Sequence, residues 1–412
     1  MYQTRRTKLA NMLPENAILF VLSGKAMYSV GDEMYPFSVN RSFYYLTGLD
    51  RENMMYMLVK KDGVAQDMLV IERNDEMMAK WVGAKVLPEE ATEISGIKFI
   101  IMDDEKWDMI HRIVAYQFDH ETSIPVYADL SKQEINQVTP AYTFVSELTS
   151  KYPHMNVNDC SSYLTQLRLV KDETEVEKLK VSIDITNKAI QNMMNHVKPE
   201  MEENELEAYF DFVLKSKKCK HSFPSIVAGG KNATILHYTD NNQMIKDNSL
   251  VLVDLGASLN YYNADISRTF PANGKFSERQ KQIYNIVLEC NEYIISQVKP
   301  GQTLRGLNNL VIKFYEEKLK EIGLLENGKT VRDYYWHGVS HMLGLETHDV
   351  QLSNYKLEVG NVFTVEPGLY LEDEEIGVRI EDNVLVTEDG CINLSKDIIK
   401  SVEDIEAFMA NR

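Results

Sequence analysis

The chain has 412 residues, of which 44% are hydrophobic and 26% are charged, and its 62 acidic and 44 basic residues give a formal net charge of −18. This length predicts two or three domains, and the negative charge argues against nucleic acid or anionic lipid as partners, because both need a basic surface. The sequence has no run of about 18 apolar residues that would span a membrane, and its N-terminal apolar run is too short for a signal peptide. The four cysteines lack CxxC spacing. We therefore expect reduced thiols, a cytoplasmic location, and small molecules or peptides as substrates.

The first 150 residues alternate short apolar runs with stretches of helical periodicity. The pattern predicts strands over 17–23, 55–60, 68–72, 97–102 and 124–128, and helices over 105–117 and 132–150. Such alternation is typical of an α/β domain with a largely buried sheet. The region contains neither a GxGxxG nor a Walker-type loop, so it gives no support for nucleotide binding. Because the pattern changes near residue 170, we expect one domain over 1–170 and a second over 171–412.

Two long helices in the second half of the chain open with a capping box. Asp172 has Glu175 three residues later, and Ser277 has Gln280 at the same distance. The proline of a Val-Lys-Pro tripeptide ends each helix, because proline cannot continue it. The shorter amphipathic helices predicted to follow are 204–219 and 303–322.

Two aspartates face one another across a predicted hairpin at 250–270. Asp254 and Asp265 each lie within a strand-like apolar run. With Leu259 and Asn260 as a two-residue turn, the antiparallel register pairs Asp254 with Asp265 on one face. Like charges directly opposite one another destabilise a sheet. Either a cation lies between them, or the register is accidental and both aspartates are solvated.

A second predicted hairpin repeats this arrangement with glutamates. A turn centred on Asp373 and Glu374 pairs Glu366 with Glu381, although Pro367 interrupts one strand and makes the register softer. Four carboxylates buried without cations would cost many kcal/mol, because desolvation of each ion alone costs several. The two hairpins together therefore favour a site with two divalent metal ions.

Three of the nine histidines lie between residues 337 and 348. A histidine on an apolar stretch is usually a core residue, but three in one glycine-rich segment indicate a functional cluster. One imidazole with four carboxylates is an oxygen-rich ligand set, which suits Mn²⁺, Co²⁺ or Fe²⁺ better than a thiolate-preferring ion. His337 and His341 have the spacing of a HExxH motif, but Gly338 replaces the glutamate, which argues against a mononuclear zinc peptidase.

The sequence resembles the pita-bread metallopeptidases, and within them the aminopeptidase P family, over nearly its whole length. The motifs that carry the resemblance are His237-Tyr-Thr, Val253-Asp-Leu-Gly, Ala264-Asp-Ile-Ser-Arg-Thr-Phe, His337-Gly-Val-Ser-His, Thr347-His-Asp-Val, Thr364-Val-Glu-Pro-Gly-Leu-Tyr and Arg379-Ile-Glu-Asp. The segment from Asn40 to Gly48 also resembles the N-terminal domain that creatinase and prolidase share. The resemblance implies an α+β fold, in which a creatinase-like α/β domain precedes a pita-bread catalytic domain.

The resemblance implies a dinuclear metal centre. Its ligands would be Asp254, Asp265, His341, Glu366 and Glu381, with Asp265 and Glu381 bridging the two ions. All five residues are present, which argues against creatinase, because the creatinase pattern lacks this metal set. The implied cofactor is a pair of divalent ions, Mn²⁺ first, with Co²⁺, Fe²⁺ and Zn²⁺ as alternatives. The segment between Tyr370 and Gly377 is shorter than in several family members, which bears on the rim of the pocket.

The activity that the resemblance implies is release of the first residue from peptides whose second residue is proline. Divalent ions would lower the pKa of bound water. Glu366 would accept its proton and pass it to the proline nitrogen, which leaves as a secondary amine. The residues expected to contact substrate are His237 and His348, as hydrogen-bonding groups, and His337, Tyr370 and Arg379, as the proline pocket.

Alternatives for single residues and for the function stay open. Arg379 could equally form an ion pair that orients Glu381 or Asp254, and Tyr370 could be a core residue. The runner-up enzyme is prolidase, which cleaves only Xaa-Pro dipeptides, although the His337 motif resembles its aminopeptidase P form more closely. A peptide-binding protein without catalysis is disfavoured by the complete ligand set, and methionine aminopeptidase by the large N-terminal domain. Family analogy implies a homo-oligomer, dimer or tetramer.

Overall fold

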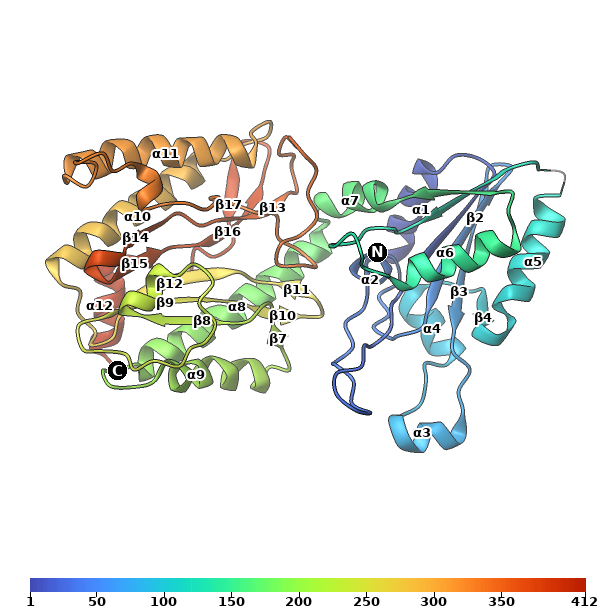
Figure 1. Ribbon diagram of the computed structural model, residues 1–412, viewed down its shortest axis with the longest axis horizontal. Helices are drawn as coiled ribbons and strands as arrows, with labels where there is room; N and C mark the ends of the chain where they lie inside the picture. Colours follow the sequence, from blue (N-terminus) through green and yellow to red (C-terminus); the bar gives the residue numbers. More distant parts are fainter. Residues whose placement is uncertain (120) are drawn as a thin grey trace. The chain divides into compact units, whose positions relative to one another are not determined.

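A computed structural model of the chain describes residues 1–119 and 121–412. The chain divides into an N-terminal unit, Met1–Arg168, and a C-terminal unit, Leu169–Arg412 (Figure 1). This division lies two residues before the boundary that the sequence pattern predicts. No helix in the described ranges combines the length and the apolar character that a membrane crossing needs.

A mixed six-stranded sheet forms the centre of the N-terminal unit, in the order β4-β3-β2-β1-β5-β6. Its strands are β1 (Ala17–Leu22), β2 (Met55–Lys61), β3 (Val64–Ile71), β4 (Ile100–Met102), β5 (Ile124–Ala128) and β6 (Met155–Asp159). β2 runs antiparallel to both its neighbours, whereas the other pairs are parallel. The five predicted strands are confirmed, with shifted ends. β6 lies outside the prediction because its alternation is weak: three of its five residues are Asn or Asp.

Seven helices accompany this sheet among the described residues: α1 (Tyr2–Met12), α2 (Arg41–Thr47), α3 (Glu76–Val82), α4 (Pro88–Ser95), α5 (Lys106–Gln117), α6 (Pro140–Lys151) and α7 (Ser161–Leu169). α5 confirms the helix predicted over 105–117. The helix predicted over 132–150 is wrong over 132–139, because Thr139 caps α6 through the Tyr142 amide and Pro140 occupies its first turn. The short helix α3 buries no residue, so it has no apolar stripe by which periodicity could predict it.

The long helices of the C-terminal unit begin where the capping boxes predict. Its helices are α8 (Glu173–His196), α9 (Glu203–Ser216), α10 (Glu278–Gln297), α11 (Leu304–Glu321) and α12 (Val402–Ala410). Both boxes, Asp172 with Glu175 and Ser277 with Gln280, have their two reciprocal hydrogen bonds. In Figure 1 the pair α8 and α9 and the pair α10 and α11 lie on opposite sides of the strands.

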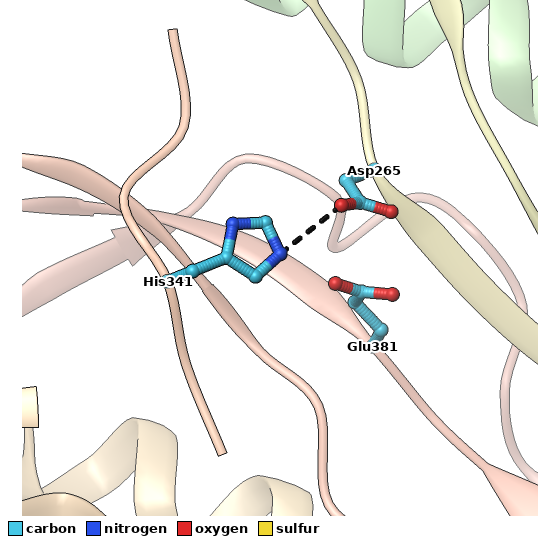
Figure 2. Close-up of side chains that lie close together, drawn as sticks. All are labelled: Asp265, His341 and Glu381. Carbon is cyan, nitrogen blue, oxygen red and sulfur yellow. Dashed lines mark ion pairs between the residues drawn. The ribbon is translucent and has the colours of Figure 1, made fainter. Parts of the chain in front are cut away.

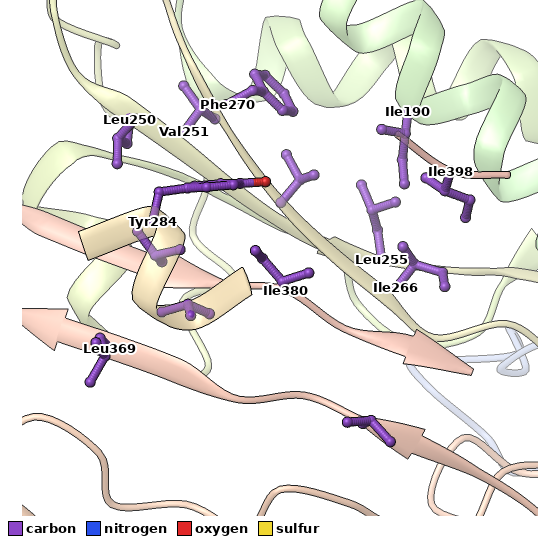
Figure 3. Close-up of a cluster of buried hydrophobic side chains, with 14 of the residues drawn as sticks. Ile190, Leu250, Val251, Leu255, Ile266, Phe270, Tyr284, Leu369, Ile380 and Ile398 are labelled. Carbon is purple, nitrogen blue, oxygen red and sulfur yellow. The ribbon is translucent and has the colours of Figure 1, made fainter. Parts of the chain in front are cut away.

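The strands of the C-terminal unit form small sheets around a large apolar core. They are β7 (Lys220–His221), β8 (Ile226–Gly229), β9 (Leu250–Leu255), β10 (Ala257–Leu259), β11 (Tyr262–Asn263), β12 (Ile266–Pro271), β13 (Val362–Val365), β14 (Gly368–Leu371), β15 (Ile376–Arg379), β16 (Asp382–Val386) and β17 (Cys391–Asn393). The sheet orders are β12-β9-β8, β13-β16-β17, β11-β10-β7 and β14-β15. Fully buried Ile190, Leu255, Ile266, Tyr284 and Leu369 bring two helices and three strands into one cluster (Figure 3). This packing fixes the strand ends that carry the candidate site.

The register predicted for the first hairpin is wrong by two residues. β9 and β12 pair so that Asp254 lies opposite Ser267 rather than Asp265. The turn is Asn260–Tyr261 instead of Leu259–Asn260, and both turn residues have positive φ, 51° and 67°, as a type I′ turn requires. Because side chains alternate with a period of two, this shift leaves the two aspartates on the same face as diagonal neighbours.

The register predicted for the second hairpin is confirmed. Gly368 lies opposite Arg379, and Val365 lies opposite Asp382. Glu366 and Glu381 therefore face one another where Pro367 interrupts the ladder. The turn between β14 and β15 is a 3₁₀ segment, Glu372–Glu374.

Candidate metal centre

Three of the predicted metal ligands point toward one another in the C-terminal unit (Figure 2). One ligand atom from each of Asp265, His341 and Glu381 lies within 4.8 Å of the other two. The Nε2 of His341 is 3.2 Å from the Oδ2 of Asp265. Asp265 directly precedes β12, Glu381 lies between β15 and β16, and His341 lies in an irregular segment beside β13. Residues far apart in sequence thus meet in one site.

The other two predicted ligands adjoin this group. The Oε1 of Glu366 is 3.6 Å from the Nε2 of His341, and Asp254 is the diagonal neighbour of Asp265. Burial raises the pKa values of Asp265 and Glu381 well above their usual range, and the charges of the neighbouring carboxylates raise them further. Burial also raises the pKa of Glu366. Such a site favours any species that adds positive charge.

Two buried carboxylate oxygens lack hydrogen-bond partners within the described ranges: Oδ1 of Asp254 and Oε1 of Glu381. An unsatisfied buried acceptor costs about 1–3 kcal/mol, and a divalent cation would satisfy both. Carboxylates with one imidazole form a ligand set that suits hard or borderline divalent ions. The residues therefore fit a divalent metal site.

His341 is held with one ring nitrogen available to a cation. Its Nδ1 lies 3.1 Å from the carbonyl oxygen of Met342, which can only accept, so Nδ1 carries the proton. In the neutral ring, Nε2 then presents its lone pair toward Asp265. A second hydrogen bond that fixes the tautomer in this way is typical of metal-binding histidines.

Arg379 connects two of the carboxylates. It is buried, and its Nη2 donates to the Oδ2 of Asp254 at 2.7 Å, while its Nε donates to the Oγ of Ser267 at 2.8 Å. The Ser267 hydroxyl in turn donates to the Oε2 of Glu381 at 2.8 Å. Of the two roles considered for Arg379, the ion pair with Asp254 is present, and Ser267 extends it to Glu381.

A directed chain of hydrogen bonds runs from Arg379 to His337. The Arg379 Nη1 donates to the Tyr370 hydroxyl at 2.9 Å, and that hydroxyl lies 2.9 Å from the His337 Nε2. Burial, with the Arg379 charge adding to it, lowers the pKa of His337 to about 4, so the ring is neutral near pH 7. Its Nδ1 must donate to the Gly338 carbonyl oxygen, 2.8 Å away. Nε2 therefore accepts the Tyr370 proton, and Tyr370 is more than a packing residue.

Sequence reasoning missed two hydroxyl residues of the site, Ser267 and Thr364. The Thr364 hydroxyl donates to the Oε1 of Glu366 at 3.2 Å and accepts from the His341 amide at 3.1 Å. Each of these residues lies two positions from a predicted ligand on the same strand face. In Asp265-Ile-Ser267 and Thr364-Val-Glu366 the hydroxyl residue and the ligand are two positions apart, and this spacing predicts that both side chains lie on one face of the strand.

The two remaining predicted histidines, His237 and His348, are exposed. The rings of His348 and His341 are 4.1 Å apart between centroids. Partial desolvation of its ring by the surrounding residues, with the charges of His341 and His237 adding to it, lowers the pKa of His348. Buried contacts hold its loop, because Asp349 forms an ion pair with Lys171 at 2.8 Å in which both side chains are 1% exposed.

The segment that carries His237 is organised by one buried carboxylate. Glu203 is fully buried, and its Oε1 accepts from the Gly229 amide at 2.8 Å and from the Asn232 side chain at 2.9 Å. Its Oε2 accepts from the Tyr238 hydroxyl at 2.7 Å and from the Gln243 amide at 3.0 Å. All four donors lie within residues 229–243, so Glu203 pins both ends of this segment.

Known proteins match this chain in sequence and in structure. Residues 177–388 match the Metallopeptidase family M24, and residues 2–120 match the Aminopeptidase P, N-terminal domain. The Xaa-Pro aminopeptidase of Haemophilus influenzae is 31% identical, over 99% of this chain and 96% of its own length.

The similar structures include a protein from Bacillus anthracis assigned as an aminopeptidase P, with a TM-score of 0.96 and 45% identity over 100% of this chain and 98% of that one. Aminopeptidase P of Escherichia coli with the inhibitor Pro-Leu has a TM-score of 0.90 and 29% identity, with the same coverage. A zinc-substituted form of the E. coli protein with product has a TM-score of 0.89, 28% identity and again the same coverage.

Proposed function

The chain belongs to metallopeptidase family M24, and from this membership we propose that it is a metal-dependent Xaa-Pro aminopeptidase, which releases the first residue of peptides with proline in second position. The observation that carries the proposal is the convergence of four carboxylates and one imidazole in one site. Its neighbour, the aromatic pair His337 and Tyr370, offers a surface for proline.

We infer that the site holds two divalent ions, with Mn²⁺ preferred. The residues that would hold them are Asp254, Asp265, His341, Glu366 and Glu381, with Asp265 and Glu381 shared between both ions. The unpaired oxygens of Asp254 and Glu381 support this ligand set. When bound, such ions supply Lewis acidity, which lowers the pKa of water and polarises a carbonyl oxygen.

Glu366 is the proposed proton carrier. It is only partly buried, and Thr364 orients its Oε1. Glu366 would accept a proton from the attacking water and deliver it to the proline nitrogen. Without that proton the secondary amine would be a poor leaving group.

Substrate binding is proposed to use both charge and shape. The carboxylates of the cluster would accept hydrogen bonds from the N-terminal amine, which limits cleavage to the first residue. The neutral His337 ring and Tyr370 would contact the proline ring, which fixes φ near about −65° and has no N–H to donate. Arg379 would hold Tyr370 in place, and the exposed His237 and His348 would bond to substrate oxygens.

The deciding experiment incubates the metal-loaded protein with Arg-Pro-Pro, with its N-acetylated form, with Arg-Ala-Pro and with the dipeptide Arg-Pro, and follows products by mass. We expect release of arginine from Arg-Pro-Pro. Acetylation, or alanine in second position, should slow release at least about tenfold, or about 1.4 kcal/mol. Cleavage of the dipeptide alone would establish a prolidase instead, and cleavage of none would leave a binding protein. The homo-oligomeric state and the cytoplasmic location stay predictions.

A further inference from the structure

One large aromatic side chain beside the proposed proline surface has no assigned role. Trp336 directly precedes His337, and the residue is 48% exposed. Its ring centroid lies 5.0 Å from that of Tyr370, at an interplanar angle of 40°. Within the described ranges the indole N–H has no hydrogen-bond partner. An exposed indole with a free donor, fixed against a buried tyrosine, has both a stacking face and a polar edge to offer.

Trp336 is the outer member of a continuous aromatic surface. The His337 ring lies 4.7 Å from the Tyr335 ring and 5.6 Å from the Tyr370 ring, between centroids. Tyr335 and Tyr370 are both buried, with 2% exposure each, so Trp336 is the member of this surface most open to solvent. The Tyr370 hydroxyl bonds to Arg379 and His337, and the Trp336 ring packs on the Tyr370 ring, so Trp336 adjoins the proposed proline surface.

The direction of a bound peptide follows from its chemistry, given the proposed function. The N-terminal amine is drawn to the carboxylates, and the proline ring lies on His337 and Tyr370. The chain beyond proline must then continue past these two rings, and Trp336 is the exposed aromatic side chain in ring contact with Tyr370.

We propose that Trp336 forms a binding subsite for the third residue of the substrate, and that this subsite favours a planar or apolar side chain, such as phenylalanine or proline, over glycine. The proposal rests on the proposed function and adds a specificity residue to it. The indole face would cover the third side chain, and the indole N–H would donate to a backbone carbonyl of the peptide.

The test compares kcat/KM of the metal-loaded full chain for Arg-Pro-Phe and Arg-Pro-Gly. We expect the wild-type protein to prefer phenylalanine by about fivefold, which is about 1 kcal/mol. Trp336→Ala should bring the ratio of the two values close to one by lowering the value for Arg-Pro-Phe about fivefold more than the value for Arg-Pro-Gly, and Trp336→Phe should keep most of the preference. Phe212→Ala, which removes another exposed aromatic ring from the same unit, is the matched control and should keep the full ratio.

A binding measurement separates this proposal from the proposed function. Calorimetric titration with Pro-Phe and Pro-Gly needs no turnover, and Trp336→Ala should weaken the binding of Pro-Phe by about fivefold more than that of Pro-Gly. If no tripeptide is cleaved but this difference appears, the subsite stands and the proposed function fails. An unchanged Phe-to-Gly ratio in Trp336→Ala, or an equal loss for both peptides, would overturn the subsite.

Discussion

Replacing Glu203 with glutamine tests whether one buried carboxylate organises the segment that carries His237. The four donors to Glu203 come from Gly229, Asn232, Tyr238 and Gln243. A glutamine has the same shape, but it removes the charge from all four hydrogen bonds and turns an NH₂ group toward two of the donors.

The size of the effect follows from the number of hydrogen bonds. Hydrogen bonds to a charged group contribute about 1.5–3 kcal/mol each, against about 0.5–1.5 kcal/mol for neutral ones, and an orphaned buried donor costs a further 1–3 kcal/mol. We therefore expect Glu203→Gln to lower the free energy of unfolding by about 3 kcal/mol or more. For a unit of this size that corresponds to a fall in Tm of about 6–12 °C.

Differential scanning calorimetry measures the change, and Glu292→Gln is the matched control. Glu292 is exposed on α10, so the same chemical change should cost less than about 0.5 kcal/mol there. Peptide cleavage well below the Tm should also fall in Glu203→Gln, because Tyr238, the neighbour of His237, loses its anchor. A Tm equal to that of Glu292→Gln would show that the segment holds its conformation without this carboxylate and would refute the reasoning.

Three further predictions concern the site. Elemental analysis after dialysis should find both metal ions lost from Asp265→Ala but mainly one lost from His341→Ala; two full equivalents in Asp265→Ala would contradict its bridging role. Glu366→Gln should lower kcat by about 10²-fold or more, the usual scale for loss of a general base, and a change confined to KM would contradict proton transfer. Lys171→Met should remove the buried ion pair with Asp349 and lower the free energy of unfolding in urea by about 3–5 kcal/mol. Restoration by the double variant with Asp349→Leu is the control, and a fully stable single variant would contradict the structural role of the pair.

The carboxylate site was predictable from sequence because it depends on the alternation of side chains more than on the turn. The predicted turn Leu259–Asn260 is wrong by one residue, because the turn in the structure includes Tyr261 at positive φ. A tyrosine is uncommon at positive φ, so the sequence does not indicate a turn at this residue. Moving a turn by one residue moves the pairing by two, and a move of two returns every side chain to its own face. Asp254 and Asp265 therefore lie on the same face of the hairpin, although the predicted register is wrong.

The contacts that hold the site could not be predicted in the same way. The Glu203 hydrogen bonds join a helix to donors as far as 40 residues along the chain, and the link between Ser267 and Glu381 spans 114 residues. In the sequence, Ser267 looks like any other serine, and Glu203 looks like the many glutamates at helix starts that only cap the helix or face solvent. Such partners are set by tertiary packing, which the local pattern does not encode.

The charge balance of the site bears on the number of metal ions it would hold. Four carboxylates share the site with one guanidinium, Arg379, and His337 is neutral near pH 7. If all four acids are ionised, three negative charges remain uncompensated, and one divalent ion would leave the site negative. Two ions would make it slightly positive. A slightly positive site stabilises the negative charge that develops on a scissile carbonyl oxygen during attack by water. The charge balance thus supports the proposal that the site holds two ions.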